Sequence, residues 1–339
     1  MPTQKHILII RLSAMGDVAM TVPVLRAFTA QYPEVKLTVL TKPFFKPFFK
    51  DIPNVLVFEA DIKGKHKGVI GLWKLSRELK KLHVDVVADL HNVLRSKILK
   101  FFFFGKRVVQ VNKGRQEKKA LISGEIFQQL KATHQRYADV FKTLGFPIDL
   151  NHPIFPKAKN LSPKYLEIVG QDAKKWIGIA PFAAFEGKMY PLDLMEDVIE
   201  TLSKAYKVLL FGAGDHEAKM LQAISNKFDN VTSIAGQFSL DEELDIISNL
   251  DIMLSMDSGN AHLAAMLGVK VITVWGVTHP YAGFLPFNQT IDSAILADKN
   301  KYPKIPTSVY GNKFPSGYQD AIKTISPIQI TSKLTNYLK

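Results

Sequence analysis

The segment spanning residues 250–276 constrains the fold of this chain more than any other stretch. A short apolar run at 252–254 leads into the polar residues 257–260. A helical pattern follows and stops at Gly268, a residue that commonly ends helices, before a β-branched run over 269–274. This succession predicts a strand, a loop, a helix and a second strand. Such a unit is typical of a parallel sheet flanked by helices.

The loop of this unit is the first candidate binding site. Ligands bind at the carboxyl ends of parallel strands, and the N-terminus of a helix offers free N–H groups to an anion. Asp257 or Ser258 would cap the helix, Gly259 would let a phosphate approach the backbone beside Asn260, and His262 lies in the first turn. The alternative is an ordinary helix cap followed by a histidine that only packs, and the segment alone leaves both open.

Strands and helices alternate along the rest of the chain. Strands are expected at 5–11, 37–40, 55–58, 84–88, 108–111, 176–180, 208–211 and 231–234, and helices at 21–32, 71–81, 94–104, 192–206, 217–227 and 241–248. Residues 112–150 are expected to be mainly helical, and 151–175 to link two halves.

This alternation predicts an α/β protein with two doubly wound, Rossmann-like domains facing across a cleft. The expected boundaries are 1–155 and 156–325, followed by a C-terminal helix at 326–339 that could pack back toward the first domain. A length of 339 residues fits two domains.

Charge is distributed unevenly between the halves. Residues 1–150 carry a net charge of +14 and all seven arginines, whereas residues 151–339 carry −1. Arginine suits bidentate recognition of phosphate and carboxylate. The first half is therefore expected to face a polyanion, such as nucleic acid, an anionic lipid surface or an acidic glycolipid. A surface that merely keeps the protein soluble would explain the lysines but not the partition of arginines.

The composition excludes several classes of chemistry. Without cysteine the chain has no disulfide, no thiolate metal site and no cysteine nucleophile. The apolar run at 7–10 is too short for a signal peptide, and no apolar stretch approaches the 18 residues of a spanning helix. A cytoplasmic protein is expected.

The residues after the first strand form a second candidate site. Segment 11–17 contains one glycine, Gly16, so it lacks the three-glycine fingerprint of dinucleotide sites. It does provide a carboxylate, Asp17, at the carboxyl end of a strand, where it could act as a general base. The alternative role for Asp17 is the N-cap of a helix beginning near residue 18.

Three further features are weak when taken alone. The glycine-rich turn at 212–214 is common in α/β folds, and Lys188, the one cation between Lys175 and Lys204, could contact a phosphate. The aromatic and basic segments 44–50 and 100–107 could lie on a membrane surface, or could instead be core packing at helix ends.

Five motifs stand in order along nearly the whole chain, at 11–17 (with Pro23), 89–96, 188–191, 257–262 and 275–280. Together they resemble the ADP-heptose:lipopolysaccharide heptosyltransferases, glycosyltransferase family 9. The resemblance implies a GT-B fold and an inverting, metal-independent glycosyltransferase without a cofactor. It also implies an acceptor bound by the first domain and a nucleotide-sugar bound by the second.

The resemblance assigns roles to individual residues. Asp17 would be the catalytic general base, and Lys188 with loop 257–262 would hold the diphosphate. The expected donor-binding residues are Lys188, Phe238, Ser239, Asp257, Ser258, Gly259, Asn260 and His262, with Phe238 and Ser239 at the adenine pocket. The expected acceptor-binding residues are Arg11, Ser13, Met15, Gly16, His91 and Arg95.

The expected partners are an ADP-sugar and an anionic, lipid-linked core oligosaccharide, with peripheral contact at the inner face of the cytoplasmic membrane and no nucleic acid. His91 and Ser258 stand where the family often has Gln and Thr, and segment 181–187 lacks a hydroxyl residue that the family often has. These departures leave the donor sugar open. The alternatives are another GT-B enzyme, a sugar-nucleotide epimerase, or a non-catalytic polyanion-binding protein on the same fold.

Overall fold

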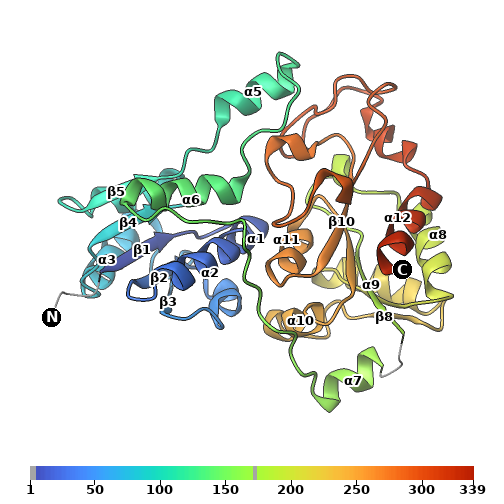
Figure 1. Ribbon diagram of the computed structural model, residues 1–339, viewed down its shortest axis with the longest axis horizontal. Coiled ribbons are helices and arrows are strands. Elements are labelled where there is room, and N and C mark those ends of the chain that lie inside the picture. Colours follow the sequence, from blue (N-terminus) through green and yellow to red (C-terminus); the bar gives the residue numbers. More distant parts are fainter. Residues whose placement is uncertain (1–4, 171–173) are drawn as a thin grey trace. The chain divides into compact units, whose positions relative to one another are not determined.

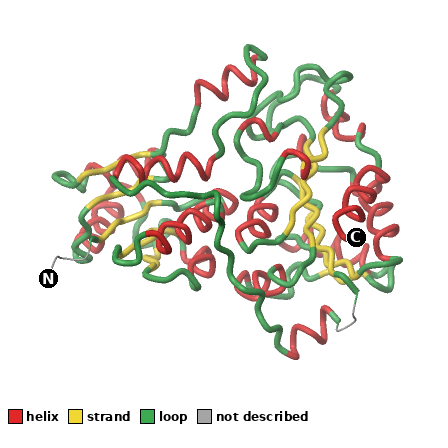
Figure 2. Tube along the Cα trace, in the orientation of Figure 1, coloured by secondary structure: helices red, strands yellow, loops and turns green. Residues whose placement is uncertain are grey.

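The computed structural model describes residues 5–170 and 174–339, so residues 171–173 of the expected link lie outside the described residues. The chain divides into two α/β units (Figures 1 and 2). Unit 1 comprises residues up to Lys113 together with Ala132–Phe155, and unit 2 comprises Gly114–Lys131 and Pro156–Lys339. Over the described residues, every helix falls short of the length and apolar character needed to cross a bilayer.

Unit 1 is built on a five-stranded parallel sheet with the order β3-β2-β1-β4-β5. Its strands are β1 (His6–Ile10), β2 (Lys36–Thr41), β3 (Val55–Glu59), β4 (Val86–Asp89) and β5 (Arg107–Gln110). Its helices are α1 (Met15–Ala19), α2 (Thr21–Gln31), the 3-10 helix η1 (Pro43–Phe49), α3 (Gly68–Lys80), α4 (Leu94–Phe101) and α6 (Thr133–Leu144).

Two helix pairs pack against this sheet. The apolar side chains of α3 and α4 join one core with Leu8 and Ile10 of the fully buried strand β1. Helices α2 and α6 pack together, with the rings of Phe28 and Phe141 4.9 Å apart. Because β1 is buried at every position and apolar from Ile7 to Ile10, it is typical of a central strand in a parallel sheet that is covered on both faces.

Unit 2 contains a six-stranded parallel sheet with the order β11-β10-β9-β6-β7-β8. Its strands are β6 (Trp176–Ala180), β7 (Lys207–Leu210), β8 (Val231–Ser233), β9 (Ile252–Met256), β10 (Lys270–Trp275) and β11 (Ala294–Leu296). Its helices are α5 (Arg115–Ser123), α7 (Pro163–Val169), η2 (Glu186–Lys188), α8 (Leu192–Ser203), α9 (Gly214–Ser225), α10 (Leu240–Ile247), α11 (Gly259–Met266), η3 (Pro280–Ala282), η4 (Ile291–Ser293), η5 (Tyr318–Thr324) and α12 (Pro327–Leu338).

The C-terminal helix α12 belongs to the core of unit 2. It packs against α8, and Ile330 and Leu334 are fully buried in the same apolar cluster as Ile199. Segment 114–131 also lies with unit 2, where the backbone N–H of Leu130 donates to the carbonyl of Tyr281.

The two parallel sheets confirm the predicted α/β, doubly wound class. The differences concern short elements. Helix α1 begins at Met15, within a segment expected to be a loop, and η1, α7 and β11 were not expected. Region 112–150 is less helical than predicted, since an irregular stretch separates α5 from α6. The short elements α1, η1, α7 and β11 contain too few residues to show a clear hydrophobic periodicity in the sequence.

Candidate functional site

Asp17 lies beyond the carboxyl end of β1, on the short helix α1. Its Oδ2 forms an ion pair of 2.5 Å with Nη2 of Arg11. The Arg11 side chain is buried, and its Nη1 also donates to the carbonyl of Leu90 at 2.6 Å. The Asp17 side chain keeps a third of its surface exposed. Arg11 therefore fixes the direction of a carboxylate that remains accessible.

The alternative role of Asp17 as a helix cap is wrong. The N-cap position of α1 is Ala14, and Asp17 lies within the first turn without a side-chain capping bond. Tyr137 completes the surroundings, because its ring lies 5.8 Å from the Arg11 guanidinium and its hydroxyl donates to the Asp17 carbonyl at 3.4 Å. Burial raises the pKa of Tyr137, so this hydroxyl stays protonated. Tyr137 lies 120 residues from Asp17 in the chain, and no motif or pattern in the sequence pointed to it.

The motif after β4 is organised by a buried carboxylate, Asp89. It accepts hydrogen bonds from the backbone N–H groups of His91 and Asn92, at 2.9 and 2.8 Å. It also accepts from the Ser96 hydroxyl and the Gln110 amide, at 2.9 and 3.2 Å. Asp89 is thus a fully engaged structural group that shapes the turn presenting His91.

His91 brings the β4 turn together with the β1 loop. Its Nε2 lies 3.4 Å from the hydroxyl of Ser13, and the residue is buried. Burial, aided by the charges of Arg11, Lys113, Arg95 and Lys42, lowers the pKa of His91 to about 3. A neutral imidazole therefore faces this loop. Because β1 and β4 are neighbouring strands, Asp17 and His91 follow adjacent carboxyl ends.

The other expected acceptor residues surround these two. Ser13, Met15 and Gly16 are partly exposed along the start of α1. Arg95 is partly exposed in the first turn of α4.

In unit 2, Lys188 forms an ion pair with the buried carboxylate of Asp257, and its own side chain is only 14% exposed. Nζ of Lys188 lies 2.8 Å from Oδ2 of Asp257 and 3.2 Å from its backbone carbonyl. The hydroxyl of Thr278 donates to the same carboxylate at 2.9 Å. These residues follow β6, β9 and β10, three adjacent strands, so the sheet order brings them together. Thr278 was not among the expected site residues, although it lies in the motif 275–280.

Close backbone packing lets Lys188 reach Asp257. Gly311 has a φ of +76°, and a Cβ there would lie 2.6 Å from Cγ of Lys188. A Cβ on Gly187 would lie 2.8 Å from the Gly311 carbonyl. The aliphatic part of the Lys188 side chain is therefore packed closely against Gly311, and its ammonium group is directed toward Asp257.

Loop 257–262 enters helix α11 as predicted. Ser258 occupies the N-cap position but makes no capping bond, because its hydroxyl lies 3.1 Å from that of Ser255. Gly259 and Asn260 are partly exposed at the first turn, and His262 is buried. Because Nζ of Lys188 also contacts the backbone carbonyl of Asp257, the ammonium group lies at the loop that leads into α11.

Phe238 and Ser239 precede helix α10, away from this ion pair in the sequence. Ser239 caps the helix, accepting from the Glu242 N–H at 3.4 Å, while Glu242 accepts from the Ser239 N–H at 2.8 Å. Together with Lys164, these bonds lower the pKa of Glu242 to about 2. The ring of Phe238 lies edge-on to Tyr165 at 5.6 Å. Both proposed adenine contacts therefore also have a structural role.

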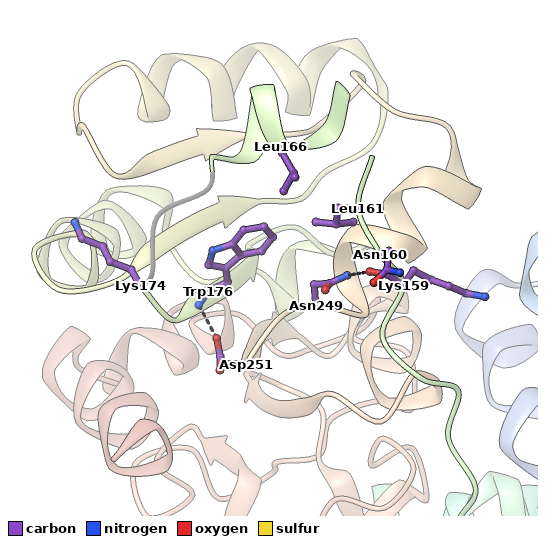
Figure 3. Close-up of a pocket in the computed structure, with 8 residues that line it drawn as sticks. All are labelled: Lys159, Asn160, Leu161, Leu166, Lys174, Trp176, Asn249 and Asp251. Carbon is purple, nitrogen blue, oxygen red and sulfur yellow. Dashed lines mark hydrogen bonds between the residues drawn. The ribbon is translucent and has the colours of Figure 1, made fainter. Parts of the chain in front are cut away.

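An open hollow of about 440 Å³ lies at the opposite edge of the unit 2 sheet (Figure 3). Trp176 begins β6 there, and its backbone N–H donates to Asp251 at 2.7 Å. Asn249 donates to the carbonyl of Lys159 at 2.9 Å, which fastens the linker over the hollow. Since these residues lie at the amino ends of β6 and β9, the hollow is separate from the Lys188 site.

Comparisons with known proteins agree with the predicted resemblance. A family model described as glycosyltransferase family 9 (heptosyltransferase) matches residues 72–310. Lipopolysaccharide core heptosyltransferase OpsX of Haemophilus influenzae is 26% identical over 316 residues, covering 87% of this chain and 86% of that protein.

Two solved structures have the same fold. The family 9 glycosyl transferase of Veillonella parvula aligns with a TM-score of 0.77 and 18% identity, over 99% of this chain and 97% of that chain. The E. coli heptosyltransferase WaaC with ADP aligns with a TM-score of 0.67 and 17% identity, over 98% and 99%. At these identities the likeness concerns the fold, and it confirms the GT-B class.

Proposed function

Because the chain belongs to glycosyltransferase family 9, the heptosyltransferases, we propose that it moves a heptose from an ADP-sugar to an anionic, lipid-linked lipopolysaccharide core acceptor. The chain is a glycosyltransferase, and its relative OpsX is named as a lipopolysaccharide core heptosyltransferase. The donor, the stereochemistry and the metal requirement are the parts that the proposal adds.

Unit 2 would hold the diphosphate of the donor. An ammonium group has three donors, and Asp257 takes two of those on Lys188, so one is left for a phosphate oxygen. The Asp257 charge offsets that of Lys188, so the N–H groups that begin α11 at Gly259 and Asn260 would supply the rest of the anion site. In this account Asp257 and Thr278 position Lys188. The surroundings of Phe238 and Ser239 would take the adenine.

Unit 1 would supply the base and the acceptor contacts. An acceptor hydroxyl would give its proton to Asp17 as it attacks the anomeric carbon on the face opposite the nucleotide, which inverts the configuration. Arg11 is a positioning residue that holds the Asp17 carboxylate. Ser13, Met15, Gly16, His91 and Arg95 would line the acceptor.

The leaving diphosphate would be stabilised by fixed protein groups in place of a metal ion. Lys188 and the start of α11 can carry out this task because they are preorganised by Asp257 and the sheet. A divalent ion would instead share the charge of the leaving group.

The main support for the proposal is the ion pair with Arg11, which positions the accessible carboxylate of Asp17. Asp17→Asn should lower turnover about a hundredfold or more, as expected for loss of a general base, while ADP binding stays the same. Asp149→Asn, in an exposed loop of unit 1, is the matched control and should leave turnover unchanged. Near-normal turnover of the Asp17 variant would contradict the proposal.

Two measurements test the donor and the metal. ADP should raise the melting temperature, whereas UDP and GDP should not, because the proposed pocket takes adenine. EDTA should leave transfer intact, and activity that returned only with a divalent ion would refute the metal-free account. Stabilisation by UDP in place of ADP would favour the alternative of a related enzyme with another donor.

A further inference from the structure

Helix α4 of unit 1 exposes an unusually apolar stripe. Leu94 and Phe101 are 75% and 79% exposed, and Phe104, in the turn that follows, is 98% exposed. Leu94, exposed Lys97 and Phe101 are spaced by three and four residues, which places them on one side of the helix, and Phe104 follows three residues later. The opposite side carries buried Ser96, Leu99 and Phe103. Phe101 and Phe104 are therefore turned away from the core, whereas Phe103 faces it.

Helix α3 repeats the arrangement. Ile70 and Trp73 are 72% and 47% exposed, and Arg77 extends the same stripe with its guanidinium 5.6 Å from the Trp73 ring. Leu72, Leu75 and Leu79 on the other side are buried. An exposed tryptophan whose ring contacts a cationic side chain is typical of protein surfaces that lie at the interface between water and lipid.

The two stripes share one side of unit 1. Helices α3 and α4 contact each other, and the buried residues of both join a single core with β1. Since both helices cover the same face of the sheet, their exposed sides point away from it together. We define the α3–α4 face by its apolar residues Ile70, Trp73, Leu94, Phe101 and Phe104 and its basic residues Lys67, Lys74, Arg77, Lys97, Lys100 and Lys106.

The charges of this face have one sign. Segments 67–77 and 94–107 contain no aspartate or glutamate. The next acidic residue, Glu78, is engaged by Lys65 at 2.7 Å and by His66 at 3.4 Å. A face that joins aromatic rings to uncompensated cations is complementary to anionic phospholipid head groups.

We propose that the α3–α4 face docks unit 1 on an anionic lipid bilayer. The apolar side chains would enter the boundary between head groups and acyl chains, while the surrounding lysines and Arg77 contact phosphates. A protein partner fits less well, because protein interfaces are depleted of lysine at their centres. Contiguous apolar groups of this kind are uncommon on proteins that meet only water.

This inference rests on the proposed function in one respect, since a lipid-linked acceptor places the enzyme at a membrane. It also distinguishes the two aromatic and basic segments of the sequence. Segment 44–50 is mainly core, because Phe45, Phe48 and Phe49 are buried and Phe44 alone of its aromatics is exposed. Segment 100–107 supplies the exposed rings of Phe101 and Phe104.

Vesicle binding without any sugar substrate tests the proposal. The wild-type protein should bind vesicles of equal parts phosphatidylglycerol and phosphatidylcholine, and bind phosphatidylcholine vesicles at least tenfold more weakly. The double variant F101S/F104S should lose about tenfold or more in affinity for the mixed vesicles. Ile328→Ser is the matched control, since Ile328 is 75% exposed on α12 of unit 2 and should not affect binding.

Tryptophan fluorescence tests whether the α3–α4 face contacts the lipid. Trp73 emission should shift to the blue on vesicle binding, and the shift should vanish in Trp73→Phe, since the other tryptophans, Trp176 and Trp275, both lie in unit 2. Wild-type affinity of F101S/F104S, or no binding by the wild type, would overturn the proposal. Self-association of the wild type that F101S/F104S abolishes would assign the face to a second copy instead.

A soluble acceptor separates this proposal from the proposed function. F101S/F104S should transfer sugar to a lipid-free core acceptor at the wild-type rate, because Phe101 ends α4 and Phe104 follows it, whereas the proposed acceptor residue Arg95 lies in the first turn of that helix. Failure of both proteins to transfer sugar would contradict the proposed function, whereas vesicle binding would still support the lipid face.

Discussion

Replacement of Asp257 by Asn should destabilise unit 2 far more than loss of an ordinary ion pair. The side chains of Lys188 and Asp257 are 14% and 8% exposed, so the variant would leave an ammonium group buried without its counter-charge. Removal of one partner from a buried pair costs about 3–5 kcal/mol. The Asn oxygen can still accept from Lys188 and Thr278, so we expect a loss near the lower end, about 3 kcal/mol.

The assay is urea unfolding followed by tryptophan fluorescence in a Trp73→Phe background. The remaining tryptophans, Trp176 and Trp275, both lie in unit 2 and report its unfolding. Glu196→Gln is the control, because the Lys227–Glu196 pair is shorter, at 2.5 Å against 2.8 Å, but its side chains are 53% and 28% exposed. That exposed pair should contribute less than about 1 kcal/mol.

The double variant K188M/D257N decides between a charge effect and a packing effect. With both charges removed, the variant should be more stable than the sum of the single losses predicts, with a coupling of about 2 kcal/mol or more. Additive losses, or a cost below about 1 kcal/mol for Asp257→Asn, would refute the argument that burial makes this pair important.

Two further predictions concern unit 1. Arg95→Ala should raise the acceptor KM and flatten the salt dependence of acceptor binding, while the ADP dissociation constant stays the same. The reason is that Arg95 is partly exposed at the start of α4 and lies far in the sequence from the donor residues. Equal weakening of donor and acceptor binding would show that Arg95 has a structural role. In the wild type, the folded state keeps His91 neutral down to its pKa of about 3, whereas in the unfolded chain the imidazole takes up a proton below its ordinary pKa of 6.5. The free energy of unfolding therefore falls as the pH falls from about 6.5 to about 3. His91→Gln should reduce this fall. Melting temperatures measured across that range check the result, and identical acid sensitivity in the variant would contradict it.

The sequence predicted the long elements because each carries a periodic signal. Strand β6 has the predicted bounds, and α8 begins at the predicted Leu192. The apolar run of β1 and the β-branched run of β10 are long enough to show burial on both faces of a sheet. Helix α1 is different, since five residues complete little more than one turn. Helix α1 forms because of where the chain lies after β1, and the local sequence has no periodicity that predicts it.

The candidate residues Asp17, Lys188 and Asp257 stood out in the sequence by their positions after predicted strands, but their interaction partners did not. Asp17 was expected either to cap a helix or to act as a base, and Arg11 was expected to contact the acceptor. The structure pairs the two, because the chain turns back immediately after β1. Tyr137 and Thr278 contribute through tertiary contacts across 120 and 21 residues. Sequence spacing cannot report such contacts without an alignment that shows which positions vary together.

The same ion-pair principle operates differently in the two units. Arg11 is the buried member of its pair, and it holds Asp17 where a third of the carboxylate surface is open to a proton donor. In unit 2 Asp257 is buried and Lys188 is only 14% exposed, and Asp257 holds Lys188 at the loop that leads into α11. A base needs an accessible oxygen, whereas a leaving group needs a cation that is already in place and poorly hydrated. The exposure of Asp17 and the burial of Lys188 therefore match the opposite tasks that the proposed transfer gives them.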